Sequence, residues 1–183
     1  PGPDPLLRGE AFIRIIGRDE PLPIRENVPG AILREPLPVE RRKQFEAVKA
    51  QADKGDAEAQ LNVAARYADG NGVAQDPVKS SKYLRKAAEQ GSARAQCLLG
   101  LNYANGEGVK PDKREAARWL RLAADQGLAE AEFDLGMCYA NGDGVPKNPV
   151  EAVGWYRKAA AQGLPEAESE IGNCYLEGIG VPK

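Results

Sequence analysis

The 183-residue chain contains no histidine. This absence removes the commonest general base, the commonest metal ligand and every Ser-His or Cys-His nucleophile pair. The three cysteines, Cys97, Cys138 and Cys174, are an odd number and cannot all pair within one chain, so they do not indicate a compartment. We therefore expect a non-enzymatic protein without catalytic residues, cofactor or bound metal.

Excess charge and long apolar runs are also missing. The 25 basic and 27 acidic residues give a net charge of −2, which provides no electrostatic footprint for nucleic acid. No stretch approaches about 18 uninterrupted apolar residues, so we expect no membrane span. The chain begins at Pro1 without an initiator Met or a visible signal peptide. An exported protein with its signal removed would look like this, as would a cytosolic fragment; we favour a periplasmic or exported protein.

What the chain does have is a 36-residue period through its last two thirds. The recurring residues are Gly55, Gly91, Gly127 and Gly163, then Tyr67, Tyr103, Tyr139 and Tyr175, and the Gly-x-Gly-Val turns at 70–73, 106–109, 142–145 and 178–181. Self-similarity at this period indicates a solenoid, in which each unit buries its apolar face only against its neighbours.

Each unit predicts two helices joined by a glycine turn. In the first unit, small and apolar residues recur at helical spacing over 57–69, and the Gly-x-Gly pair then ends the helix. Asp76-Pro77 is a typical N-cap and first residue for a second helix, which ends at Gly91. Gly or Ala at 64, 100, 136 and 172 allows the helix backbones to approach closely.

The repeated pattern A-x-A-x-x-x-L-G-x-x-Y-x-x-G-x-G-V-x-x-D resembles the Sel1-like repeat, a relative of the tetratricopeptide repeat, over about three and a half copies in 56–183. The resemblance implies an all-α fold, an α/α solenoid that is a right-handed superhelix of helix-turn-helix repeats. It also implies that the first helices line a concave wall. Some disulfide-rich family members join helices through cysteines, but the facing positions here hold Ala88, Ala124 and Ala160.

Both ends of the array depart from the repeat. Residues 40–55 predict a degenerate second helix that caps the N-terminal end. Residues 1–39 hold eight of the fourteen prolines and are expected to be extended. They form either a mobile leader or a strap that docks on the solenoid or on a partner's sheet edge. The fourth unit stops after its first helix and turn, so we expect an uncovered C-terminal face: intermolecular packing there, a longer natural chain or a disordered remainder are the alternatives.

Function is expected at the positions that vary within the constant frame, on the outward side of the first helices. The expected partner-binding residues are Leu61, Asn62, Arg66, Leu98, Leu101, Asn102, Phe133, Asp134, Met137, Glu170 and Asn173. The apolar members are not needed for stacking, and Phe133 and Met137 are the expected anchors. The alternative is a strip that is covered by the chain's own N-terminal segment or tolerated as exposed surface.

The family resemblance implies a scaffold or adaptor that binds a protein partner on the concave face. The alternative is a bacterial immunity protein that neutralises a secreted toxin, and a small-ligand or glycan-binding module is less favoured. The Gly-x-Gly turns follow helices rather than strands, so we do not interpret them as phosphate loops. The cysteines are interpreted as small buried hydrophobes, with a reactive or cross-linked thiol as the alternative.

Overall fold

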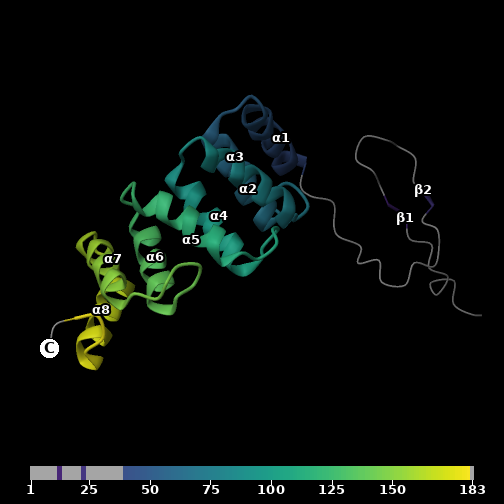
Figure 1. Ribbon diagram of the computed structural model, residues 1–183. Helices are drawn as coiled ribbons and strands as arrows, with labels where there is room; N and C mark the ends of the chain where they lie inside the picture. Colours follow the sequence, from purple (N-terminus) through teal and green to yellow (C-terminus); the bar gives the residue numbers. More distant parts are fainter. Residues whose placement is uncertain (1–11, 14–21, 24–38, 182–183) are drawn as a thin grey trace, which may run out of the picture. The chain divides into compact units, whose positions relative to one another are not determined.

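The computed structural model describes residues 12–13, 22–23 and 39–181, in two units that divide after Pro36 (Figure 1). In the first unit, strands β1 (Phe12–Ile13) and β2 (Leu22–Pro23) pair antiparallel, with Phe12 opposite Pro23. The remainder of the extended segment expected over 1–39, including the proposed strap, lies outside the described residues.

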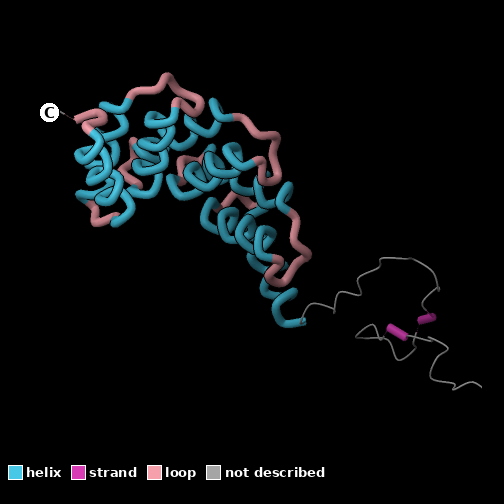
Figure 2. Tube along the Cα trace, turned by 90° about the horizontal axis from the view of Figure 1, so that it is seen from below, coloured by secondary structure: helices cyan, strands magenta, loops and turns pink. Residues whose placement is uncertain are grey.

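The second unit is an array of α-helices. Within residues 39–181 these are α1 (Val39–Asp53), α2 (Ala57–Asp69), α3 (Pro77–Glu89), α4 (Ala93–Asn105), α5 (Lys113–Ala124), α6 (Ala129–Asn141), α7 (Pro149–Ala161) and α8 (Pro165–Glu177). Each helix packs against the next one along the chain, and Figure 2 shows them following one another, joined by short loops. The predicted all-α solenoid is confirmed, with α2, α4, α6 and α8 as the first helices of the repeats and α3, α5 and α7 as the second.

The helix ends use the side chains that the sequence predicted. Asp76 accepts a hydrogen bond of 2.9 Å from the backbone N–H of Lys79, three residues on, and so caps α3. The equivalent Asp112 and Asn148 cap α5 and α7 in the same way. The first helices end at glycines in the left-handed region, such as Gly70 with φ 73°. These caps satisfy backbone groups that would otherwise lack partners at the helix termini.

The second glycine of each turn locks one repeat onto the one before it. Gly108 has φ +68°, and a Cβ at this position would lie 1.9 Å from the carbonyl oxygen of Pro77, at the start of α3. Only glycine allows both the left-handed backbone and this close approach. Gly72 approaches the carbonyl oxygen of Arg41 in the same manner. The first turn therefore packs on α1, as the later turns pack on the second helices.

The core lies between paired first and second helices. Leu99 and Leu135 are fully buried on first helices. Beside them, a Cβ at Gly100 would lie 2.8 Å from Leu120 Cγ, and one at Gly136 would lie 2.5 Å from Tyr156 Cε1. The expectation that small residues allow close helix packing therefore holds in α4 and α6. Gly172 on α8 has nothing within 4 Å of its Cβ position, because no described helix covers that side.

Polar contacts also repeat between units. Arginines on second helices donate to the tyrosine hydroxyls of the following first helices, in the pairs Arg85–Tyr103, Arg121–Tyr139 and Arg157–Tyr175. These bonds join one unit to the next at the recurring tyrosines, so the Tyr that marks the period in the sequence also links neighbouring repeats.

Candidate functional site

The candidate site is the outward side of α2, α4, α6 and α8, which we call the first-helix face. All eleven residues expected to bind a partner lie on these helices, and each is at least partly exposed. Seven of them fall into three places along the array: a hollow between α2 and α4, a contact between α4 and α6, and a hollow between α7 and α8. The other four contact neighbouring helices elsewhere: Leu101, Asn102, Phe133 and Met137.

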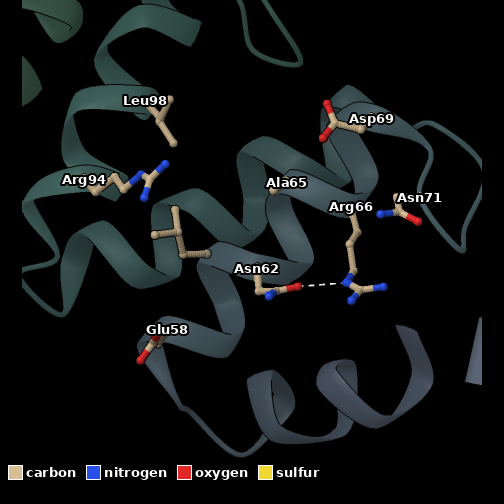
Figure 3. A pocket seen from close by; sticks show the side chains of 9 residues that line it. Glu58, Asn62, Ala65, Arg66, Asp69, Asn71, Arg94 and Leu98 are labelled. Atoms are coloured by element: carbon tan, nitrogen blue, oxygen red, sulfur yellow. Dashed lines mark hydrogen bonds between the residues drawn. The ribbon is translucent and has the colours of Figure 1, made fainter. Parts of the chain in front are cut away.

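The hollow between α2 and α4 has a volume of about 400 Å³ (Figure 3). It is lined by Glu58, Leu61, Asn62, Ala65, Arg66, Asp69, Asn71, Arg94 and Leu98. Four of these, Leu61, Asn62, Arg66 and Leu98, were expected from the sequence. Arg66 donates through Nε to Asn62 Oδ1 at 2.8 Å, and Figure 3 shows Arg94 and Leu98 entering from the neighbouring helix.

Arg94 was missed in the sequence analysis, although a signal for it exists. The same slot holds Glu58, Glu130 and Glu166 in the other three first helices, so α4 reverses the charge of an otherwise acidic row. The ion pairs among residues 39–181 include neither Arg94 nor Arg66. Neither guanidinium group is therefore neutralised by a carboxylate of the described residues, although Arg66 hydrogen-bonds Asn62.

Phe133 and Met137, the expected anchors, are partly engaged by the fold. The Phe133 ring centroid lies 5.6 Å from that of Tyr156 on α7. The Tyr156 hydroxyl donates to Met137 Sδ at 3.1 Å. Burial raises the pKa of Tyr156, which is consistent with a neutral phenol packed into the interior. The two side chains thus support the α6–α7 pair as well as facing outward.

Asp134 lies at the contact between α4 and α6. Cys97 Sγ on α4 is 4.0 Å from Asp134 Oδ2 and is positioned to donate to it. Burial, with a smaller effect of Glu130, raises the pKa of Asp134 to about 6. Burial and the two nearby carboxylates raise the pKa of the Cys97 thiol to about 12. Cys97 is therefore a buried, protonated thiol, as the interpretation of a small buried hydrophobe requires, whereas Cys138 and Cys174 are only partly buried.

The remaining expected residues have separate surroundings. Asn102 donates through Nδ2 to Ser81 Oγ at 2.8 Å, so it links α4 to α3. Leu101 packs against the buried cluster around Leu120 and Leu135. Glu170 and Asn173 line the second hollow, of about 240 Å³, between α7 and α8.

The family model for the Sel1 repeat matches residues 57–92, 93–128, 129–164 and 165–183. The chain belongs to the Sel1 repeat family. It therefore carries three matched repeats of full length and part of a fourth, in the register of its first helices.

Solved Sel1 repeat structures resemble the chain. The protective antigen c5321 of uropathogenic Escherichia coli, which has an SLR fold, is 42% identical with a TM-score of 0.73, over 75% of this chain and 29% of that one. A Sel1 repeat protein from Oxalobacter formigenes is 35% identical with a TM-score of 0.74, over 77% and 58%. Cysteine rich protein B of Helicobacter pylori is 26% identical with a TM-score of 0.58, over 70% and 95%. The chain thus spans less than two thirds of the first two structures, and no curated protein sequence matches it.

The Sel1 frame carries no metal cluster within the described residues, where no three His, Cys, Asp or Glu side chains are grouped to hold an ion. None of the helices α1 to α8 is long and apolar enough to cross a membrane. The three cysteines are free.

Proposed function

We propose that this Sel1 repeat protein is a non-enzymatic scaffold that binds a protein partner on its first-helix face, the concave wall that the family resemblance implies. Sel1 repeats typically mediate protein–protein interactions. The hollow between α2 and α4 supports the proposal, because it combines apolar side chains with arginines that form no ion pair among the described residues.

The observation that carries the proposal is the exposure of Leu98. Its slot holds the polar residues Asn62, Asp134 and Glu170 in the other first helices, so stacking does not require an apolar side chain there. Leu98 is 37% exposed at the edge of the hollow. An exposed apolar residue beside unpaired polar groups is typical of a protein-binding surface.

Substitution of Leu98 tests the proposal. Leu122 on the second helix α5 is 40% exposed and provides a matched control outside this face. We expect Leu98→Glu to lose the partner that the full chain captures by cross-linking from an extract of its source cells, while Leu122→Glu retains it. Both variants should keep their helical circular dichroism. Capture that survives Leu98→Glu, or is lost equally in both variants, would refute a role for this face.

Two narrower expectations belong to the same proposal. The immunity-protein alternative would make a secreted toxin the partner, and co-expression of the chain with such a toxin tests it through cell survival. A periplasmic or exported location is tested by fractionation of the source cells. Toxicity that co-expression does not change would count against the immunity function, and recovery in the cytosol would count against a periplasmic or exported location. Neither result affects the proposed scaffold function.

A further inference from the structure

The basic residues of the first-helix face are confined to one end of the array, where they lie together with Glu58 and Asp69. Both of its basic residues, Arg66 and Arg94, line the hollow between α2 and α4. The charged residues in the outward slots of α6 and α8 are all acidic: Glu130, Asp134, Glu166, Glu170 and Glu177. No basic residue is interspersed among these acidic ones on α6 and α8. The electrostatic potential of the face therefore differs between its two ends.

The hollow end suits an apolar side chain with an acidic neighbour. Leu61, Ala65 and Leu98 supply apolar surface. Arg94 forms no ion pair among the described residues, and Arg66 hydrogen-bonds only the neutral Asn62. Although Glu58 and Asp69 also line the hollow, neither pairs with these arginines. A guanidinium group recognises a carboxylate through two parallel hydrogen bonds, which makes an acidic side chain the matching ligand.

The acidic end suits basic side chains. The only side-chain donor that the described residues direct at Asp134 is the weak Cys97 thiol, at 4.0 Å. Glu170 lines the second hollow, which contains one basic residue, Lys147, from the loop before α7. A partner's Lys or Arg would supply the strong donor and the counter-charge that Asp134 lacks.

Building on the proposed scaffold function, we propose that the first-helix face binds an extended peptide segment with segregated charges. An apolar side chain and an acidic one enter the hollow between α2 and α4, and basic side chains lie over α6 and α8. Packed helices are spaced by about 10 Å and an extended chain advances about 3.4 Å per residue, so each first helix faces about three residues of the segment. A segment of about twelve residues covers the four helices.

Synthetic peptides of twelve residues test this inference on the full chain. One set carries three Glu on one side of a central Leu and three Lys on the other. The Glu residues are N-terminal in one peptide of this set and C-terminal in the other. A second set has the same composition with alternating charges. We expect one direction of the segregated set to bind at least tenfold more tightly than the alternating set in fluorescence anisotropy.

Charge reversal on the protein supplies the matched controls. Arg94→Glu should weaken the segregated peptide at least tenfold, and replacing the peptide's Glu residues with Lys should restore binding to this variant. Lys82→Glu, at an exposed position on α3, should change affinity less than twofold. At the acidic end, Glu130→Lys should weaken binding, whereas Glu89→Lys on α3 should not.

Several outcomes would overturn the inference. These are equal affinity for segregated and alternating peptides, no binding of any peptide at millimolar concentration, or equal effects of Arg94→Glu and Lys82→Glu. A dimer of the full chain that Arg94→Glu dissociates would make a second copy the occupant. If the peptides fail while Leu98→Glu still abolishes partner capture, only this inference fails; if capture is insensitive to Leu98, the proposed function fails as well.

Discussion

At the scale of single residues, a row of buried amides joins successive repeats. Gln96 Nε2 donates to the carbonyl oxygen of Ala88 at 3.0 Å, and its Oε1 accepts from Gln126 at 2.8 Å. Gln60 makes the same pair of bonds one repeat earlier. Both side chains are buried, so each bond satisfies a group that water does not reach.

The third repeat breaks this row, because Glu132 occupies the buried amide's slot. Its carboxyl group accepts from Gln162 at 2.9 Å but has no amide N–H to donate to the carbonyl oxygen of Ala124, as Gln96 donates to Ala88. We expect Glu132→Gln to restore the missing bond and to raise the free energy of unfolding by about 1 kcal/mol in urea denaturation at pH 7. The reverse change, Gln96→Glu, should lower it by a similar amount. A destabilised Glu132→Gln variant would contradict the role assigned to this row.

Asp134 makes stability depend on pH. Burial raises its pKa in the folded protein to about 6 from an ordinary value of 3.8. The protonated carboxyl therefore favours the folded state: this contribution is fully present below about pH 4 and is lost as the pH rises through about 6. We expect Asp134→Asn to gain about 1 kcal/mol over the parent at pH 7, after allowance for solvent screening, and nothing at pH 4. Urea midpoints at the two pH values measure this, and an equal gain at both would show that the carboxyl is not the cause.

At the scale of the structural elements, the turns hold neighbouring repeats together. Gly108→Ala would require a left-handed alanine and would place Cβ 1.9 Å from the Pro77 carbonyl oxygen. We expect a loss of about 2–4 kcal/mol in the free energy of unfolding, since the α3 start or the turn must move. Gly154 is the control: it lies inside α7, with nothing within 4 Å of its Cβ position. Gly154→Ala should gain about 0.5–1 kcal/mol, and a mild effect at Gly108 would show that the turn contact is dispensable.

The elements were predictable from the sequence because their determinants are local and repeat. N-cap residues, helix-ending glycines and small residues at helical spacing recur at each copy, and the first helix expected over 57–69 is α2 as observed. The candidate site was less predictable, because it depends on contacts between elements. Tyr156 fills a slot that holds Leu84 and Leu120 in other repeats, and its longer side chain engages Phe133 and Met137.

At the scale of the whole array, each unit is stabilised by its neighbours. Helix α4 packs against both α3 and α5, whereas the main packing of α8 among the described helices is against α7. On α8, Tyr175 is 54% exposed and Leu176 is 87% exposed. In a solenoid, stability is approximately a sum of unit terms and nearest-neighbour interfaces. A helix with one interface should therefore open locally at a lower free energy than one with two.

This difference predicts a gradient of hydrogen exchange along the 183-residue chain. We expect amides of α8 to exchange at least tenfold faster than those of α4 in mass spectrometry of peptide fragments. Gly172 offers a specific test, because nothing lies within 4 Å of its Cβ position. Gly172→Ala should improve the helix by about 1 kcal/mol and slow exchange in α8 about fivefold without affecting α4. The equivalent Gly136→Ala should instead destabilise the array, since its Cβ would lie 2.5 Å from Tyr156 Cε1. Equal protection of α8 and α4, or a destabilising Gly172→Ala, would mean that a single interface holds α8 as firmly as two hold α4.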